Sequence, residues 1–409
     1  MDKIKVAMIA PESFPVPPVK GGAVESVIHQ VAGFLGSDIS LSILSVADTA
    51  LPLAHMEGST EYLHVMREGS LWREKVPLRL AKLPFRLPLR CYRSSYISAI
   101  LSKLETIAPD IVHIHNSPVY VLFIKERFPE MKVILHMHNR HLVRMNRQLA
   151  TVIAKKADIL AGVSQYIVKD ILSAFPWVST KCRCLYNGVN INIFKPKWEM
   201  DIQKKRDQLG IEKNASVLLF AGRITKQKGI HVLLEALSRD FPPGWSLVVA
   251  GSSWFGEQKT NKYMRQIKQL AATLQNPIIF TGYVPHSEMP VLLAMAEVVI
   301  LPSIGEEAFP LIALETASVG TPILCNSIGG AAESVIDDKT GFINKDISIE
   351  GLQKKLQAVY SLSKEQLEDI GFQAREHISK QYSWTVCAGK YEVVYGELMT
   401  YSHEKGRTI

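Results

Sequence analysis

The chain has 409 residues, of which 47% are apolar and 21% are charged, as in an ordinary soluble globular protein. This length exceeds what one hydrophobic core usually holds, so two domains of roughly 200 residues are expected. No apolar run reaches the roughly 18 to 20 residues that span a bilayer. The first residues lack the apolar core and cleavage site of a signal peptide, so we expect a cytoplasmic protein.

The formal net charge of +8 favours anionic partners such as nucleotides, acidic polymers or membrane surfaces. There is no zinc finger and no aromatic-basic RNA-binding signature, so no nucleic-acid partner is expected. The five cysteines are an odd number, and the spacing of Cys182 and Cys184 matches no common zinc pattern. We therefore expect neither a disulfide framework nor a metal site.

Lys3 to Ala10 is the first expected buried strand. The proline-rich stretch Pro11 to Lys20 and the pair Gly21-Gly22 follow, ahead of an amphipathic helix from about Val24 to Leu35. Glycines between a strand and a helix let the backbone approach a ligand that a Cβ would obstruct. The alternative is a tight turn without a ligand.

The segment from Leu71 to Arg93 mixes basic residues with leucines and prolines. It contains a single acidic residue, and its basic residues are Arg73, Lys75, Arg79, Lys82, Arg86, Arg90 and Arg93. Basic residues interleaved with apolar ones bind anionic lipid or polymer, so the segment is a candidate acceptor patch or peripheral contact with an anionic membrane. The alternative, which we prefer, is that the segment is a solvent-exposed loop over the N-terminal domain without a binding role.

Residues 110–115, 132–138 and 158–164 read as three further strands, and Ser164 is expected to cap the helix after the last of them. Imidazoles at the carboxyl ends of parallel strands lie where such sheets bind ligands. His115 and His138 are therefore candidate site residues, against the ordinary interpretation of structural histidines.

The second domain is expected to open with the strand Ser216 to Ala221. A loop, Gly222 to Gly229, then places Arg223 and Lys228 between that strand and a helix. The guanidinium fork and the ammonium point charge are the two side chains suited to a diphosphate. A surface basic cluster is the alternative. Further strands are expected at 247–251 and 278–284.

The apolar run Val298 to Leu301 is the expected strand before the most informative stretch, residues 302–330. Pro310 marks a helix start and Gly320 its end. Glu307 stands in the loop and Glu315 within the helix, at the spacing E-x7-E. Helix amides suit a diphosphate and carboxylates suit sugar hydroxyls, so the stretch suits a sugar nucleotide. Two solvated helix-end charges are the alternative.

Three stretches resemble motifs of the retaining GT-B glycosyltransferases of family 4. Residues 302–320 are similar to P-S-x-x-E-G-F-P-x-x-x-x-E-A-x-x-x-G, residues 222–229 to G-R-x-x-x-x-K-G, and residues 187–196 to N-G-V-D-x-x-x-F-x-P. The opening P-V-P-x-V-K-G-G further resembles the spore coat protein SA group of that family.

The resemblance implies an α/β GT-B architecture, with two Rossmann-like domains facing a central cleft. Residues 1–194 would form the N-terminal acceptor domain, with the last helix, about 383–409, packing back on it. Residues 195–382 would form the C-terminal nucleotide-sugar donor domain.

The resemblance also assigns roles to residues. Glu307 would hold the sugar hydroxyls beside His138, while Arg223 and Lys228 would neutralise the departing diphosphate. Asn139 and Asn190 depart from the family pattern, in which aspartate is usual. The donor-binding residues by the same resemblance are Gly21, Gly22, Arg223, Lys228, Gly251, Tyr283, Val284, Phe309, Pro310, Leu311 and Glu315, the last at the ribose.

The implied function is the transfer of a hexose, with retention of configuration, from a nucleotide diphosphate sugar. A UDP-sugar is the favoured donor, and the acceptor is a glycan, a lipid, or a cell-surface or spore-coat component. The sugar nucleotide is a substrate, and no cofactor is expected. No aspartate is followed two residues later by another, so metal-independent chemistry is expected. Two alternatives stay open: a GT-B sugar-nucleotide epimerase, and a non-catalytic coat or scaffold protein. The protein is expected in the cytoplasm, and this expectation includes a position at the periphery of a membrane or of a spore coat.

Overall fold

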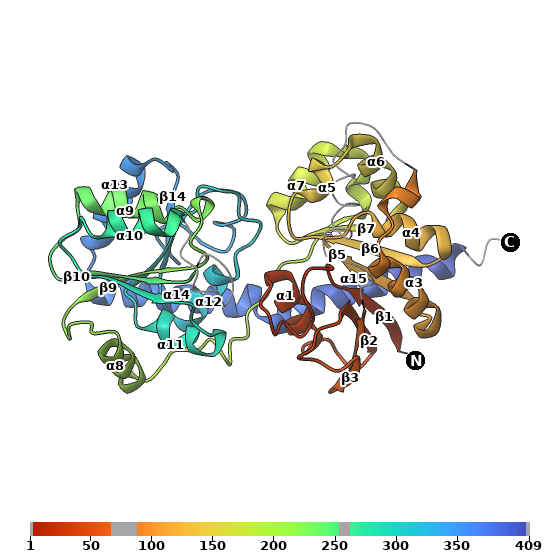
Figure 1. Ribbon diagram of the computed structural model, residues 1–409, viewed down its shortest axis with the longest axis horizontal. Coiled ribbons are helices and arrows are strands. Elements are labelled where there is room, and N and C mark those ends of the chain that lie inside the picture. Colours follow the sequence, from red (N-terminus) through yellow and green to blue (C-terminus); the bar gives the residue numbers. More distant parts are fainter. Residues whose placement is uncertain (1–2, 67–87, 253–261, 406–409) are drawn as a thin grey trace. The chain divides into compact units, whose positions relative to one another are not determined.

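The computed structural model describes residues 3–66, 88–252 and 262–405, and the chain divides into two compact units (Figure 1). Unit 1 comprises Met1–Asn187 together with Trp384–Ile409, and unit 2 comprises Gly188–Ser383. Residues 71–87 of the basic segment lie outside the described residues, so its contact with an anionic surface stays a prediction.

Unit 1 is built on a sheet with the strand order β3-β4-β2-β1-β5-β6-β7-β8. All of its strand pairs are parallel except β3 with β4. In chain order the elements are β1 (Ile4–Ile9), α1 (Ala23–Ala32), β2 (Ile39–Val46), β3 (Ala54–Glu57), β4 (Thr60–Val65), η1 (Leu89–Tyr92), α3 (Ser95–Ile107), β5 (Ile111–His115), α4 (Tyr120–Arg127), β6 (Lys132–Met137), α5 (His141–Arg144), α6 (Arg147–Lys156), β7 (Ile159–Gly162), α7 (Gln165–Ala174), η2 (Pro176–Lys181), β8 (Cys182–Cys184) and α15 (Trp384–Lys405).

Helices cover both faces of this sheet, which is why its central strands β5 and β6 are buried along almost their whole length. In Figure 1, α4, α6 and α7 lie over one face, while α1 and α15 lie on the other and contact each other. Ser164 accepts a hydrogen bond from the amide of Ile167 at the start of α7, so the predicted helix cap is confirmed.

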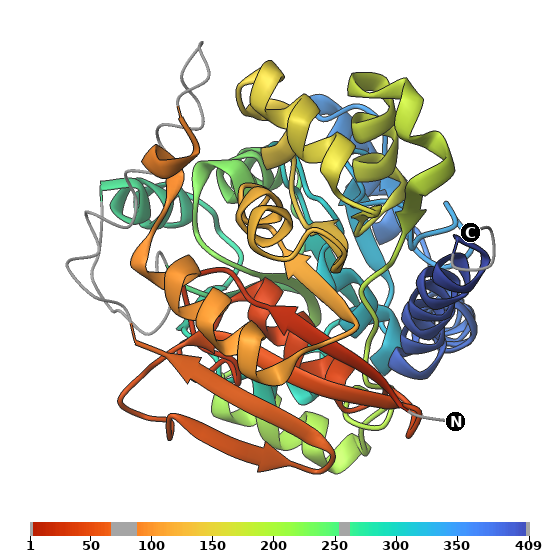
Figure 2. The same ribbon diagram turned by 90° about the vertical axis from the view of Figure 1, so that its right-hand side faces the viewer.

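The sequence did not indicate the β3–β4 pair, which forms the antiparallel edge of the sheet in unit 1 (Figure 2). β3 is short and largely exposed, so it lacks the apolar run that reveals a buried strand. A two-residue turn with Gly58 in the left-handed region joins it to β4. Pairing with β4, rather than local sequence, therefore makes it a strand.

Unit 2 holds a fully parallel sheet with the order β11-β10-β9-β12-β13-β14. Its elements are α8 (Glu199–Gln208), β9 (Ser216–Ala221), η3 (Lys226–Lys228), α9 (Ile230–Arg239), β10 (Trp245–Ala250), α10 (Lys262–Ala271), β11 (Ile278–Gly282), η4 (His286–Glu288), α11 (Met289–Ala294), β12 (Val298–Leu301), α12 (Leu311–Val319), β13 (Ile323–Asn326), β14 (Phe342–Asn344), α13 (Ile349–Tyr360) and α14 (Lys364–Tyr382).

Figure 1 shows α9, α10 and α13 on one face of the unit 2 sheet and α11, α12 and α14 on the other. Pro310 precedes the first residue of α12, and Gly320 ends that helix in the left-handed conformation. Both predicted helix boundaries are therefore confirmed. Both units are parallel sheets covered by helices, so the expectation of two Rossmann-like domains is correct.

Candidate active site

The loops that the sequence singled out in unit 2 follow two neighbouring strands. β9 lies between β10 and β12, and the chain proceeds outward from it in both directions along the sheet. In an open parallel sheet, ligands bind beside the carboxyl ends of the strands at the point where the order reverses. The loops after β9 and β12 therefore define the candidate site.

These two loops lie in direct contact through their backbones. Gly229 has φ +71°, and a Cβ on it would lie 1.9 Å from the carbonyl oxygen of Pro302. The amides of Ile304 and Gly305 both donate to the carbonyl of Gln227, at 2.9 Å each. Glycine at 229 is thus required both by its left-handed backbone and by the approach of the second loop.

Lys228 and Glu307 meet across these loops. The ammonium Nζ of Lys228 lies 2.6 Å from Oε1 of Glu307, and the hydroxyl of Ser303 donates to the same oxygen at 2.6 Å. Both charged side chains are largely buried, with 21% and 14% of their surfaces exposed. Low exposure strengthens such a charged hydrogen bond, so the Glu307 carboxylate has a fixed position.

The backbone of Glu307 is held by a third loop, the glycine pair after β13. Gly330 donates its amide to the Glu307 carbonyl at 2.7 Å. Gly329 has φ +62°, and a Cβ there would lie 2.2 Å from that carbonyl oxygen. The pair Gly329-Gly330 therefore positions Glu307 by close backbone approach.

Glu315 lies in the second turn of α12 and pairs with a residue that the sequence did not indicate. Nε2 of His286 lies 3.0 Å from Oε1 of Glu315. That hydrogen bond raises the pKa of His286 against the opposing effect of burial. His286 also packs edge-on against Phe194, with ring centroids 5.2 Å apart.

The remaining predicted donor residues of unit 2 lie around this centre. Phe309 is buried against Tyr382, and Pro310 and Leu311 form the start of α12, whose first amides have no side-chain cap. Such amides are free to bind an anion. Gly251 follows β10 and donates its amide to Gly282 at 2.8 Å.

Arg223 and the pair Tyr283-Val284 are more open than the Lys228–Glu307 centre. Arg223 is exposed in the loop after β9, and no residue in the described ranges hydrogen-bonds to its guanidinium. Tyr283 is 55% exposed just beyond β11, and Val284 is partly buried. The structure thus places these residues at the same edge of the sheet without bringing them into contact with Glu307.

In unit 1, Gly21 and Gly22 occur where predicted, in the loop between β1 and α1. Gly22 has φ +110°, and the space its Cβ would occupy lies 2.2 Å from the carboxylate of Glu25. Glu25 is 3% exposed, and burial raises its pKa to about 7. A buried acid against the glycine loop is a feature that the sequence reading missed.

His138 follows β6, at the carboxyl edge of the unit 1 sheet. Its Nε2 lies 2.9 Å from Nδ1 of His115, and its amide donates to the side chain of Asn116 at 2.7 Å. Burial lowers the pKa of His138, which favours a neutral imidazole. The structure therefore joins the two histidines that the sequence had proposed.

Two residues of this site, His286 and Ser303, were missed by the sequence analysis, although their positions in the sequence gave a signal. His286 follows β11 at the carboxyl edge, where ligand-binding side chains gather, and Ser303 stands in the same loop as Glu307. Their partners could not be known without the paths of the loops.

The two sheets and this site define the class of protein: a glycosyltransferase of the GT-B fold. Residues 21–193 match the model described as Glycosyltransferase Family 4, and residues 201–377 match the one described as Glycosyl transferases group 1. The chain belongs to the family 4 glycosyltransferases.

Relatives similar to the chain over nearly its whole length include glycosyltransferases and a spore protein. A putative glycosyltransferase YtcC of Bacillus subtilis is 27% identical over 97% of this chain and 93% of its own length. Spore coat protein SA of the same organism is 26% identical, over 96% and 99%. A lipopolysaccharide 1,2-N-acetylglucosaminetransferase of Salmonella typhimurium is 26% identical, over 95% and 97%.

Solved structures agree on the fold. Sucrose-phosphate synthase from Thermosynechococcus elongatus superposes with a TM-score of 0.77 at 18% identity, covering 98% of this chain and 100% of that one. Anabaena HepE in complex with UDP-glucose has a TM-score of 0.73 at 19% identity, covering 97% and 100%. Across the described ranges, no helix combines the length and apolar character needed to cross a bilayer.

Proposed function

We propose that this chain transfers a hexosyl group from a UDP-sugar to a glycan or lipid acceptor, with retention of configuration at the anomeric carbon. The observation that carries the proposal is the Lys228–Glu307 pair, fixed by Ser303 beside the start of α12. It places a cation, a carboxylate and free helix amides together at the point of the sheet where nucleotides bind.

The residues have complementary tasks in this mechanism. Lys228 and Arg223, with the first amides of α12, stabilise the negative charge that develops on the departing diphosphate. Glu307 accepts hydrogen bonds from the sugar hydroxyls near the reacting carbon, while Glu315, held by His286, accepts them from the ribose. Lys228 exchanges its carboxylate partner for the diphosphate when the donor binds.

The loops of unit 1 and the outer strands of unit 2 complete the donor contacts that we propose. Gly21 and Gly22 let the backbone of unit 1 approach the diphosphate, and His138 lies near the transferred sugar. The base lies against the segment after β11, Tyr283 and Val284, and beside Gly251. Phe309 and Leu311 present backbone amides, whereas Pro310, which has no N–H, fixes the start of α12.

Uridine is the proposed base because the structural neighbour HepE was crystallised with UDP-glucose. The Salmonella relative, named as a lipopolysaccharide N-acetylglucosaminetransferase, supports a hexosyl donor and a lipopolysaccharide-like acceptor. The spore coat relative supports a cell-surface acceptor. We also propose that the chemistry needs no metal ion, because the charge on the diphosphate is met by Lys228, Arg223 and the helix amides.

A donor panel tests the proposal. UDP-, GDP-, ADP- and dTDP-sugars are compared by thermal shift and by slow hydrolysis, and the anomeric configuration of the first product is read by NMR. We expect UDP-sugars to give the largest shift and a product that keeps the donor configuration. An inverted product would overturn retention, and loss of activity without added Mg²⁺ or Mn²⁺ would overturn metal independence. Interconversion of the sugar without an acceptor would identify an epimerase.

A further inference from the structure

Four histidines form a two-by-two array on one face of the unit 1 sheet. His113 and His115 alternate along β5, and His136 stands opposite His115 in the parallel register with β6. His138 follows two residues later on the same face, since side chains two apart on a strand share a face. Neighbouring rings in the array have centroids 4.4 to 5.4 Å apart.

Three of these rings are fully buried and carry ring nitrogens without partners. His113, His115 and His136 are each 0% exposed. Nε2 of His113 and Nε2 of His115 find no hydrogen-bond partner in the described part of the chain, and the nitrogens of His136 have none apart from an interaction with the backbone of Leu185. Leaving such a group buried and unpaired is destabilising. Buried nitrogens left unpaired in one place point to a bound water or ion.

The other nitrogens of two rings are held in the manner of metal ligands. Nδ1 of His113 lies 2.9 Å from the hydroxyl of Tyr395, and Nδ1 of His115 lies 2.9 Å from Nε2 of His138. Each Nδ1 can place its proton on an acceptor, which leaves the lone pair on Nε2. Ligating histidines characteristically donate their second N–H in this way, because it fixes the ring and its tautomer.

The surroundings favour the neutral imidazole that a metal ion needs. Burial lowers the pKa of His113, His115 and His136 well below the ordinary value. No carboxylate in the described part of the chain raises these pKa values, and the backbone of Leu185, which raises the pKa of His136, is outweighed by burial. The hydroxyl of Tyr391 is also buried and has no partner within the described ranges, and its ring lies 5.6 Å from His113 and 5.8 Å from His136.

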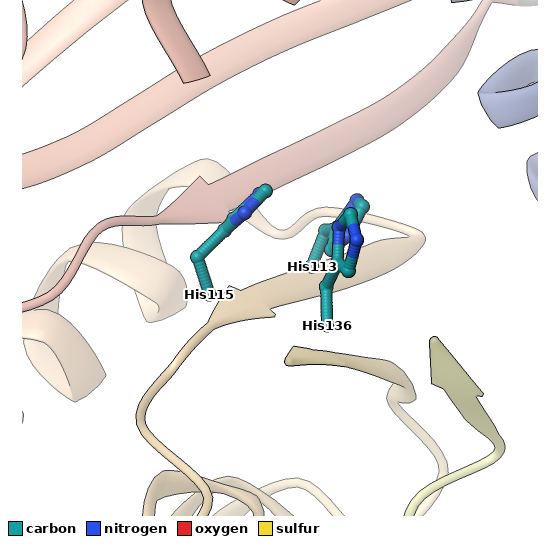
Figure 3. Close-up of side chains that lie close together, drawn as sticks. All are labelled: His113, His115 and His136. Carbon is teal, nitrogen blue, oxygen red and sulfur yellow. The ribbon is translucent and has the colours of Figure 1, made fainter. Parts of the chain in front are cut away.

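We propose that His113, His115 and His136 bind one divalent transition-metal ion such as Zn²⁺, with the Tyr391 hydroxyl or a water as fourth ligand. One nitrogen from each of the three rings lies within 4.8 Å of the others (Figure 3). Two bonds of about 2.1 Å at a tetrahedral angle separate their donor atoms by roughly 3.4 Å. The donor atoms would therefore have to move together by up to about 1.4 Å for all three rings to bind one ion.

Such an ion would tie β5 and β6 to the last helix. Tyr391 and Tyr395 lie in α15, which is far from both strands in sequence but belongs to the same unit. All three histidines are buried, so the site stabilises unit 1 instead of exposing an ion to substrate. The ion would adjoin the proposed donor site through His115, whose Nδ1 lies 2.9 Å from Nε2 of His138, but it takes no part in the proposed metal-free transfer chemistry.

Metal content and metal response test the proposal on the full chain with any affinity tag removed. We would measure bound metals in the purified protein by mass spectrometry, remove them with a chelator, and titrate Co²⁺ and Zn²⁺. We expect one equivalent to bind, a visible Co²⁺ spectrum of nitrogen ligation, and a rise in melting temperature of several degrees.

The matched variants are His136→Leu, which removes a proposed ligand, and His377→Leu, which removes a partly buried histidine of unit 2. His136→Leu should lose the Co²⁺ spectrum and the rise in melting temperature, whereas His377→Leu should keep both. A wild-type protein that binds no stoichiometric metal and gains no stability from either ion overturns the proposal, whatever the variants do. Equal binding by wild type and His136→Leu also overturns it, because the ion would then bind elsewhere.

Discussion

Lys228 Nζ lies 2.6 Å from Glu307 Oε1, although the two residues are 79 positions apart in the chain. The first ends the loop after β9 and the second lies in the loop after β12. Adjacent parallel strands bring those loops to one edge of the sheet, and Gly229 permits their contact. The pair is therefore a consequence of the sheet order as much as of the two residues themselves.

Lys228→Ala and Arg223→Ala should each lower turnover by about 10²-fold or more, as does removal of one donor that stabilises a developing anion. The melting temperature should change by only a few degrees. Lys226→Ala is the matched control, because it removes an exposed lysine from the same loop. Steady-state kinetics with the best donor would measure all three, and wild-type turnover in the first two would exclude them from the site.

The local structure around this pair could be predicted because its signals are local. An apolar run, a proline at the helix start and a glycine at its end placed β12 and α12 within a residue or two. The pairing of His286 with Glu315 could not be predicted, since it depends on where two loops run. The histidine array likewise needs the register of His115 against His136, which the sequence does not contain.

Gly329→Ala should displace Glu307 and damage both stability and turnover. A Cβ at Gly329 would lie 2.2 Å from the Glu307 carbonyl, in a residue with φ +62°. Gly210→Ala is a close control in the same unit, since Gly210 has φ +67° but nothing within 4 Å of its Cβ position. The left-handed backbone alone should cost on the order of 1 to 2 kcal/mol in both variants.

The difference between the two glycine variants isolates the contact with Glu307. Gly329→Ala should unfold at lower denaturant concentration than Gly210→Ala and should turn over about tenfold more slowly or worse. Equal stability and equal turnover would show that the loop yields without moving the carboxylate.

Glu25 should make unit 1 less stable as the pH rises. Its folded-state pKa is about 7, against 4.5 for an ordinary glutamate, because burial disfavours the carboxylate. The folded state then binds the proton more tightly, so the free energy of unfolding falls between about pH 4.5 and 7. Above pH 7 the full penalty, on the order of 3 kcal/mol, is present. In the proposed donor complex, a protonated acid would also avoid repelling the diphosphate beside Gly22.

Glu25→Gln removes this dependence and should stabilise the protein at pH 8 but hardly at pH 5. Denaturant unfolding of the two proteins at both pH values would measure the difference. Glu126→Gln, an exposed acid on α4 of the same unit, is the control and should leave the pH profile unchanged. A stability difference that is the same at both pH values would show that Glu25 does not titrate in this range.

Glu307→Ala should damage transfer far more than nucleotide binding. Its carboxylate lies in the loop before α12, hydrogen-bonded to Lys228 and Ser303, where we place the sugar. Only interactions that strengthen in the transition state alter the chemical step, so turnover should fall while the affinity for UDP stays close to that of wild type. Glu315→Ala should do the reverse, since Glu315 lies further into the helix with His286, where we propose that the ribose binds.

Calorimetry with UDP and turnover at saturating donor would separate the two carboxylates. His286→Ala provides an internal check, because it removes the partner of Glu315 and leaves that carboxylate in place. It should weaken UDP binding less than Glu315→Ala does, and it should leave turnover at saturating donor intact. If Glu307→Ala instead loses UDP affinity and keeps its turnover, the roles assigned to the two carboxylates are exchanged, because the loop residue would then bind the nucleotide.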